Sequence, residues 1–394
     1  MQKETLWTLN FITLIATNGL LFAGFHFLLP TLPVYVAGLG ASGTEIGLIV
    51  GIFGFSAIFI RLFTDTGVRA LGKKKCLYLG LILSLLSTIG YFTLTSVTGL
   101  LTARIIHGFG FGLSTTFAAA LAADVIPATR RGEGIGYFGL GSTAAMAMAP
   151  ALGIMLLTDF SASALFFTSA VITFVAVITA HLCHTTEVQT ELPAPAVHSS
   201  ICNRLYEHGT GIPAVLTIFF GAAYGSVNTY IAMMAAEANI PSSGLFFLVG
   251  TLFIFISRPF GGRLLDRFGA FAVVIPGAFF YLIALGIILT ANNLTMLLTA
   301  SAFYGLGAGL LLPALMTWML NVVLPDRRSS ASATFYNMLD IGTSTGILVL
   351  GGVGGVIGYI AMYRYVAVVM IIFLAFALLT HFVHPSTDPQ NVED

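Results

Sequence analysis

Charge is what this sequence has least of. Only 8% of its 394 residues are Asp, Glu, Lys or Arg, whereas 57% are hydrophobic and the mean hydropathy is +0.96. A soluble domain usually carries about 25% charged residues. We therefore exclude a soluble globular fold and take lipid as the solvent for most of the chain. The 16 basic and 16 acidic residues cancel, which leaves no net field to attract nucleic acid.

Cysteine is also scarce, with three residues at Cys76, Cys183 and Cys202. Their spacing matches neither a metal site nor a disulfide framework, and we expect no metal and no cofactor. The sequence lacks a Walker A motif, an H-E-x-x-H motif and a G-x-S-x-G motif. An ATP-driven pump or a hydrolase would therefore lack its phosphate cradle or its nucleophile.

Long apolar runs fill most of the chain instead. A spanning helix needs about 20 mainly apolar residues, and twelve such runs are present. They lie near 7–36, 44–68, 76–96, 98–124, 133–157, 161–183, 211–237, 243–265, 271–291, 294–322, 330–357 and 360–384. The first run is too long for the apolar core of a signal peptide and has no small-residue cleavage site, so we expect a retained helix.

One polar break divides these runs. Residues 184–210 are polar and contain two prolines, which is typical of a solvent-exposed linker. We predict an N-terminal six-helix bundle over 1–184, a cytoplasmic linker over 185–210, a C-terminal six-helix bundle over 211–385 and a cytoplasmic tail over 386–394.

The distribution of Lys and Arg predicts the orientation. If the N-terminus is cytoplasmic, 14 of the 16 basic residues fall on the cytoplasmic side and the opposite loops contain none. The two exceptions, Arg104 and Arg364, lie within apolar runs. We expect a multi-pass protein of the plasma or inner membrane with both termini in the cytoplasm.

The two halves repeat at a spacing of 197 residues, half the chain length. Arg258 follows Arg61 by that distance. The same spacing pairs segment 108–112 with 305–309 and segment 130–131 with 327–328. A common offset at three separate landmarks indicates duplication rather than chance. Secondary transporters are often built this way, and we predict an all-α integral membrane fold of twelve transmembrane helices in two pseudo-symmetric six-helix bundles.

A loop motif carries a family resemblance. Gly262, Asp266, Arg267 and Gly269 form the pattern G-x-x-x-D-R-x-G. This resembles the loop between the second and third helices of each half in the major facilitator superfamily, and the resemblance extends over essentially the whole chain. It implies a gating latch, in which the Asp is held by an Arg and by a helix N-terminus when the cytoplasmic side is closed.

The first-half copy of this loop departs from the pattern. Asp65 stands at the Gly position, Arg69 at the Asp position and Ala70 at the Arg position, while Gly72 remains. Asp65 and Arg69 can form a substitute pair if one helix continues through both. The alternative is that they are ordinary surface charges.

A second motif lies on the predicted fifth helix. The residues Gly136, Ala145, Ala149, Pro150 and Gly153 occupy the positions of the family's antiporter motif G-x8-G-x3-G-P-x2-G. Alanine replaces glycine at two of these positions. The resemblance implies a proton-coupled antiporter similar to drug and small-metabolite exporters, whereas generic close packing of membrane helices is the alternative.

Charged groups within the spans are candidates for function because burying them is costly. Arg104, Gly108 and Gly110 resemble the fourth-helix motif R-x-x-x-G-x-G of proton-coupled family members. Arg104 either snorkels to a headgroup or faces an aqueous cavity, and its place on the side without basic loops favours the cavity. His107 shares its helix face. His26 is either a proton carrier or a hydrogen-bonded packing residue.

Asp340 is the strongest isolated signal. It lies about eleven residues, or roughly 16 Å of helix, from the basic end of its span. A carboxylate at that depth must be protonated, paired or wetted. We expect it to hold a proton and a cationic part of the substrate in turn, and a hydrogen bond to a neighbouring helix is the alternative. Asn18, Asn228 and Tyr224 are weaker candidates for cavity lining.

These patterns predict a secondary active transporter and not an enzyme. We expect proton-coupled export, by alternating access, of a small amphipathic or zwitterionic organic molecule such as a drug or a metal-chelating metabolite. The expected partners are that substrate, protons and membrane lipids, with no nucleic acid, and the expected state is a monomer. The alternatives are a metabolite importer and, less favoured because the acidic residues are dispersed, an integral-membrane transferase.

Overall fold

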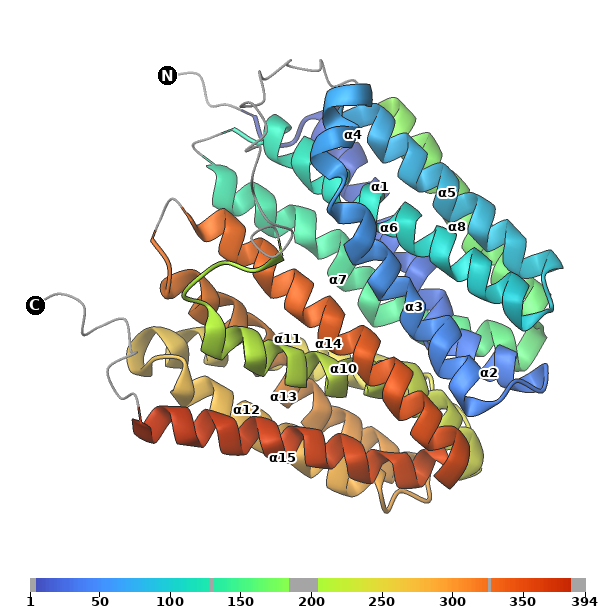
Figure 1. Cartoon of the computed structure of the whole chain (residues 1–394), viewed down its shortest axis with the longest axis vertical. Coiled ribbons are helices and arrows are strands. Elements are labelled where there is room, and N and C mark those ends of the chain that lie inside the picture. The colour runs from blue at the N-terminus through green and yellow to red at the C-terminus, as the bar shows by residue number, and fades with distance from the viewer. Residues whose placement is uncertain (1–4, 128–129, 184–204, 325–326, 384–394) are drawn as a thin grey trace, which may run out of the picture. The chain divides into compact units, whose positions relative to one another are not determined.

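The computed structural model describes residues 5–127, 130–183, 205–324 and 327–383, without the side chains of residues 65, 131–133 and 329. The predicted tail and residues 185–204 of the predicted linker lie outside these ranges. The helices are α1 (Leu9–Leu28), α2 (Thr31–Gly38), α3 (Gly43–Arg61), α4 (Thr64–Leu71), α5 (Lys73–Thr93), α6 (Val97–Val125), α7 (Arg131–Met155), the π-helix η2 (Leu156–Phe160), α8 (Ala162–Leu182), α10 (Gly211–Glu237), α11 (Leu245–Phe268), α12 (Phe271–Ile288), α13 (Leu294–Asn321), α14 (Arg328–Ile357) and α15 (Tyr359–Val383) (Figure 1).

Twelve spans in the described ranges are long and apolar enough to cross a bilayer, which confirms the predicted number. The first span, Leu9–Gly38, consists of two helices, because α1 ends at Leu28 and α2 begins at Thr31. Pro30 lies at this junction. A proline cannot continue the hydrogen-bonding pattern of a helix, so the break occurs where the prolines of the sequence predict a kink.

The helices form two compact units. Unit 1 contains the described parts of Met1–Leu39 and Ile52–His198, and unit 2 contains those of Gly40–Gly51 and Ser199–Asp394. The boundary falls within α3, so the first half of that helix is grouped with unit 2.

Corresponding helices pack together in the two units. In unit 1 the packed pairs include α1 with α6, α7 and α8, and α5 with α6 and α8. In unit 2 they include α10 with α13, α14 and α15, and α12 with α13 and α15. The five pairings match one for one, which is the arrangement expected of a duplicated six-helix unit (Figure 1).

A close backbone contact between α5 and α6 explains Gly110, the middle glycine of segment 108–112. A Cβ atom added to Gly110 would lie 2.6 Å from the Gly80 carbonyl oxygen, and one added to Gly80 would lie 2.7 Å from the Gly110 carbonyl oxygen. The equivalent pair in unit 2 repeats this contact, because a Cβ atom on Gly307 would lie 2.8 Å from the Gly277 carbonyl oxygen. Small residues allow membrane helices to approach this closely.

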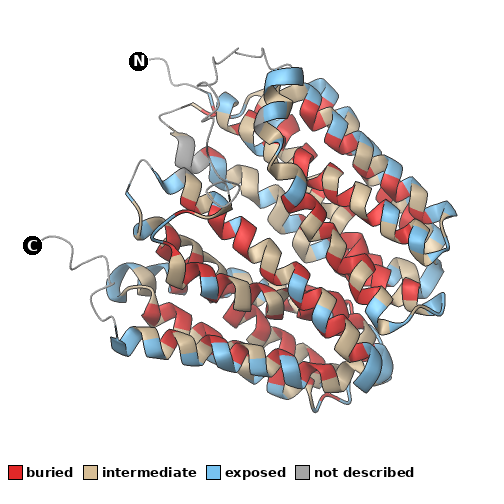
Figure 2. Cartoon of the chain, in the orientation of Figure 1, coloured by how far each residue is buried: buried red, intermediate tan, exposed pale blue. Residues whose placement is uncertain are grey.

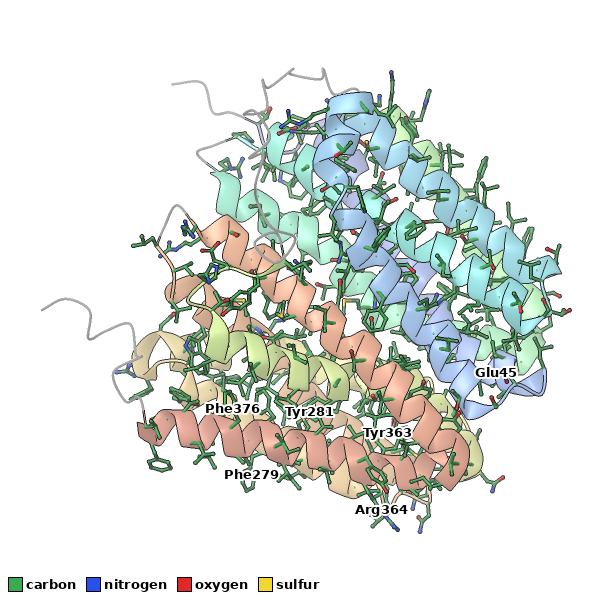
Figure 3. The ribbon with its side chains drawn as sticks, viewed as in Figure 1. Glu45, Phe279, Tyr281, Tyr363, Arg364 and Phe376 are labelled. Carbon is green, nitrogen blue, oxygen red and sulfur yellow. The ribbon has the colours of Figure 1, made fainter. Side chains whose placement is uncertain are left out.

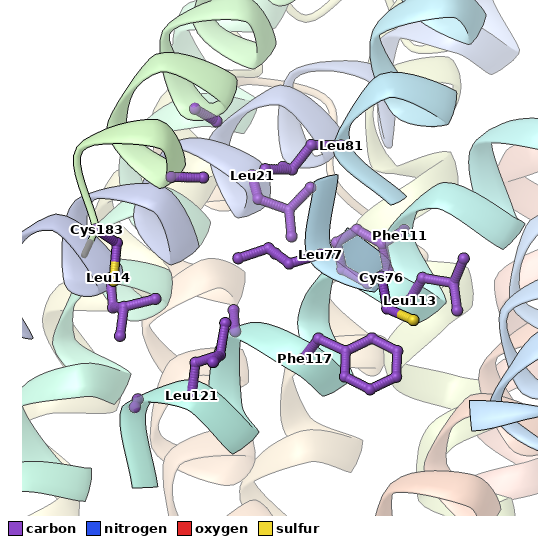
Figure 4. Close-up of a cluster of buried hydrophobic side chains, with 14 of the residues drawn as sticks. Leu14, Leu21, Cys76, Leu77, Leu81, Phe111, Leu113, Phe117, Leu121 and Cys183 are labelled. Carbon is purple, nitrogen blue, oxygen red and sulfur yellow. The ribbon is translucent and has the colours of Figure 1, made fainter. Parts of the chain in front are cut away.

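Apolar side chains fill the rest of unit 1. Leu77, Leu81, Phe111 and Phe117 are buried in a cluster drawn from several helices (Figure 4). The thiols of Cys76 and Cys183 are buried and not joined in a disulfide. Figure 2 shows that buried residues follow the faces by which helices pack within each unit.

Candidate functional site

Arg104 lies at the centre of a buried polar cluster in unit 1. It is on α6, about two turns after the helix begins at Val97, and it is 0% exposed. Its guanidinium carbon lies 4.4 Å from the centroid of the Phe53 ring and 5.6 Å from that of Phe25. The two rings stack on each other with centroids 4.5 Å apart. The charge is therefore enclosed by aromatic faces.

The guanidinium group makes no hydrogen bond of ordinary geometry within the described part of the chain. None of its three nitrogens has a hydrogen-bond partner among the described residues. The hydroxyl of Tyr91 is close enough to interact electrostatically without reaching hydrogen-bond geometry. Each ring contact stabilises a cation by about 0.5–2 kcal/mol, whereas taking an ion out of water costs several kcal/mol. The rings alone do not offset the cost of burial.

Two histidines complete this cluster. His107 Nδ1 lies 3.3 Å from the Tyr91 hydroxyl. His26 Nδ1 lies 2.9 Å from the Phe22 carbonyl oxygen, and since a carbonyl only accepts, Nδ1 carries the proton. Both imidazole rings contact Phe25, with centroids 4.9 Å away for His26 and 6.5 Å away for His107. The structure thus brings His26 to the same Phe25 ring as Arg104 and His107, which the sequence already placed on one helix face.

Asn18 takes another position. Its side-chain amide donates to the Phe138 carbonyl oxygen on α7 at 3.4 Å. Asn18 therefore lies between α1 and α7 and not among the residues around Arg104. Asn18 is 3% exposed. This geometry accounts for the side chain as a cross-link between two helices.

A second polar cluster lies in unit 2 around Asn228. The Asn228 amide donates to the Tyr304 hydroxyl and to the Tyr224 carbonyl oxygen, both at 2.7 Å. The rings of Tyr224 and Tyr304 stack at 6.2 Å. Tyr224 is half-buried while Tyr304 is buried, so the cluster extends from the surface of unit 2 into its interior.

Sequence reasoning missed three members of this cluster, Tyr281, Tyr304 and Tyr363. They come from α12, α13 and α15, and Tyr281 lies 5.3 Å from Tyr304 between ring centroids. Tyr281 and Tyr363 are labelled in Figure 3 and are fully buried, and their hydroxyls have no hydrogen-bond partner in the described ranges. One signal could have found Tyr304, because it stands 197 residues after His107.

Asp340 lies on α14 in a half-buried position. Its carboxylate interacts electrostatically with the phenol of Tyr336, about one turn earlier on the same helix.

The predicted gating residues lie at the ends of helices. In unit 2, Gly262, Asp266 and Arg267 are on α11, and Gly269 ends that helix with φ +77°. An open pocket of about 340 Å³ is lined by Arg258, Gly261, Gly262, Leu265, Asp266, Val273, Leu310, Pro313, Ala314 and Thr317.

The first-half gating residues share one helix. Asp65 and Arg69 are both on α4, which meets the condition for an i, i+4 pair. The side chain of Asp65 lies outside the described residues, so the pair itself remains a prediction. Arg69 is exposed.

The antiporter-like motif on α7 divides into packed and open positions. Ala145 and Ala149 are buried, and Pro150 is inside the helix. A Cβ atom on Gly153 would lie 2.5 Å from the Phe27 carbonyl oxygen, whereas one on Gly136 would meet nothing within 4 Å. Close helix packing therefore accounts for Gly153 but not for Gly136.

No group of three or more His, Cys, Asp or Glu residues that could hold a metal ion occurs among the residues described. The two clusters offer a cation, imidazoles, hydroxyls and an amide. Such groups bind and orient a polar ligand or move a proton.

Known proteins match the chain over nearly its whole length. The family model described as Major Facilitator Superfamily matches residues 14–231 and 213–394. An uncharacterized MFS-type transporter of Methanocaldococcus jannaschii is 22% identical over 93% of this chain and 95% of its own. The quinolone resistance protein NorA of Staphylococcus aureus is 21% identical over 84% of this chain and 86% of its own.

Solved structures give the same result for the fold. The nucleoside transporter NupG aligns with a TM-score of 0.77 at 16% identity, covering 94% of this chain and 99% of its own. This likeness confirms the predicted all-α fold with twelve transmembrane helices.

Proposed function

Because the chain belongs to the Major Facilitator Superfamily, we propose that it exports a small amphipathic or zwitterionic organic molecule in exchange for protons. Membership of this family implies a transporter of small molecules that works by alternating access. Its matched relatives are transporters and not enzymes, which removes the transferase alternative. The match to a quinolone resistance protein supports the export of a drug, and a metabolite such as a metal chelator is the other proposed cargo.

The observation that carries the proposal is the buried cluster of Arg104, His107 and His26 in unit 1. A charge enclosed within a membrane-spanning segment is costly, and a packing role would be served by an apolar residue at lower cost. The cluster places one fixed cation beside two groups that titrate near neutral pH in water. That combination suits the binding of a polar substrate together with proton movement.

Asp340 supplies the proton exchange in this proposal. A half-buried carboxylate can bind a proton in one state and a cationic group in another. Binding of the two in turn on one carboxylate gives antiport, because each release requires the other ligand to bind. We place the protein in the plasma membrane with both termini cytoplasmic, as the basic residues predict.

Uptake of a metabolite is the second candidate. The likeness to a nucleoside transporter supports it, since the same fold can carry a metabolite as well as a drug. In symport or facilitated diffusion, the buried clusters of both units would still bind the substrate, and only the direction of transport would differ from export.

The first experiment compares a deletion strain with its parent. We expect loss of export to lower tolerance to a quinolone or to reduce a secreted compound in the medium. If neither tolerance nor any secreted compound changes, the export proposal loses its support and uptake assays become the next step.

The second experiment tests the coupling residue. In inverted vesicles with an imposed proton gradient, wild-type protein should accumulate norfloxacin, a zwitterionic quinolone, or the compound identified in the first experiment. The Asp340→Asn variant should allow only downhill exchange. Asp159→Asn is the control, because that exposed acid pairs with the adjacent Thr158 hydroxyl at 2.9 Å. Gradient-driven accumulation by Asp340→Asn at the wild-type level would place the proton on another group.

A further inference from the structure

The positive charge of Arg104 has no counter-charge among the described acidic side chains of unit 1. Asp124 is paired with Lys73, whose Nζ lies 2.6 Å from the carboxylate. Asp159 accepts a hydrogen bond from Thr158. Arg104 itself is fully buried and its three nitrogens make no hydrogen bond with any described residue. The donors of this group are therefore available for a ligand.

The shape of the site defines the ligand. A guanidinium group is planar, and its five N–H donors lie in the plane in a fork that matches the two oxygens of a carboxylate. The Phe53 ring lies 4.4 Å from the guanidinium carbon and covers the group without using these donors. Paired N–H donors bind an ionised carboxylate more strongly than a neutral acceptor.

The surroundings favour an anion with an apolar body. Phe25 and Phe53 provide aromatic faces beside the guanidinium, and the neighbouring polar groups, the Tyr91 hydroxyl and the His107 ring, carry no negative charge at neutral pH. A cationic group would be repelled by Arg104. Phe25 is only half-buried, so the aromatic enclosure reaches the surface of unit 1 at that ring.

We propose that Arg104 is the anchor for a carboxylate of the transported molecule and that Phe25 and Phe53 hold the adjacent apolar part. The substrate class is therefore an amphipathic organic acid, or a zwitterion bound through its acidic end. This inference rests on the proposed transport function and adds the charge of the group that unit 1 selects.

The test is a binding series that varies only charge. Purified full-length protein is titrated in detergent with benzoate, with its neutral analogue benzamide and with its cationic analogue benzylamine, and thermal stabilisation is measured. We expect benzoate to bind about tenfold to hundredfold more tightly than benzamide, because the amide offers one neutral oxygen in place of the two ionised oxygens of the carboxylate. Any stabilisation by benzylamine should be lost in Asp340→Asn and unchanged in Arg104→Gln, because the proposed function places cationic groups on Asp340.

Variants then assign the selectivity to one residue. Arg104→Gln should abolish the preference for benzoate, and Arg104→Lys should weaken it because a point charge replaces the planar fork. Arg364→Gln is the matched control. Arg364 also lies within a span, and it is exposed and points outward from α15 (Figure 3). If Arg104→Gln does not fold, the charge series on the wild-type protein still decides the question.

Three results would overturn the inference. Equal binding of benzoate and benzamide excludes a carboxylate anchor. Equal stabilisation by sodium chloride, titrated into a chloride-free buffer, assigns the group to a small inorganic anion. Loss of benzoate selectivity in Arg364→Gln but not in Arg104→Gln places the anchor elsewhere. If the protein exports its substrate against a gradient but does not prefer benzoate to benzamide, this inference is wrong and the proposed function stands. If it prefers benzoate but carries out no gradient-driven transport, the proposed function is wrong and this inference stands.

Discussion

Replacing Gly110 by alanine tests how closely α5 and α6 must approach. The added Cβ atom would lie 2.6 Å from both the Gly80 carbonyl oxygen and the Ser84 backbone nitrogen. Ordinary contacts of a Cβ atom begin at 3.4 Å. The Ser84 hydroxyl, which would lie 2.5 Å from the Cβ atom, can rotate away, but these two backbone atoms cannot. The two helices must therefore separate by about 0.8 Å, the difference between 3.4 and 2.6 Å.

The expected cost follows from this displacement. Overpacking of a dense interior destabilises a protein by about 1–3 kcal/mol, and the higher helix propensity of alanine returns at most about 1 kcal/mol. We expect Gly110→Ala to lower the melting temperature. Gly307→Ala should do the same in unit 2, where the Cβ atom would lie 2.8 Å from the Gly277 carbonyl oxygen. Gly136→Ala is the control, since its Cβ atom would meet nothing within 4 Å.

Buried thiols provide the assay. Cys76 and Cys183 are each 2% exposed, so a thiol-reactive dye reports unfolding when they become accessible. Cys202 lies outside the described residues and is replaced by serine in all variants, which leaves only buried thiols to react. If Gly110→Ala melts at the same temperature as Gly136→Ala, the close backbone contact does not contribute to stability and our reasoning about the glycine repeat is wrong.

Two further predictions use the same thiol assay. Tyr304→Phe should lower the free energy of unfolding by about 1–3 kcal/mol, because the buried Asn228 amide loses an acceptor. Tyr281→Phe removes a hydroxyl without a hydrogen-bond partner among the described residues, so it should be neutral or stabilising. Equal losses of stability in the two variants would contradict the hydrogen bond between Asn228 and Tyr304. A hydrogen bond from Arg327 lowers the pKa of Glu207 from its ordinary value of 4.5. The stability that Glu207→Gln removes should therefore be constant above pH 4.5 and should disappear as the pH falls through the lower folded value. A difference in stability that is as large at the lowest pH where both proteins stay folded would exclude the ion pair as its source.

The duplicated scaffold could be predicted from the sequence because hydropathy and spacing determine it. Span number depends on local apolar composition, and the 197-residue offset is visible without any structure. The same offset relates the contact of Gly80 with Gly110 to that of Gly277 with Gly307. A backbone contact leaves no space for a Cβ atom, which gives a physical reason for glycine at both copies.

The polar clusters could be predicted only in part. A buried charge such as Arg104 is visible in any apolar run, but its Phe25 and Phe53 neighbours come from other helices and have no fixed spacing from it. The tyrosine cluster was missed for the same reason, since Tyr281 and Tyr363 are separated in the sequence and tyrosine is common at membrane interfaces. Such residues meet only because of how the helices rotate and pack, and the composition of the sequence does not specify that rotation or packing.

Motif matching identified positions but not their packing. Gly136 and Gly153 are equivalent in the antiporter-like pattern, yet only Gly153 lies against another helix. A glycine at an open position makes no contact that explains it within its own unit. Because packing does not explain Gly136, a substitution there can reveal another role of this motif residue without disturbing helix contacts.

The two polar clusters occupy corresponding positions of the repeat. Tyr304 stands opposite His107, and Ser301 stands opposite Arg104. The Ser301 hydroxyl donates to the Phe246 carbonyl oxygen, so unit 2 has a satisfied neutral group where unit 1 has an unpaired cation. The packing glycines match in both units because steric contact constrains them, whereas the polar centres, which lack that steric constraint, differ. On the inference above, Arg104 selects a charged group in unit 1, whereas the equivalent position of unit 2 carries a neutral hydroxyl whose hydrogen bond is already made.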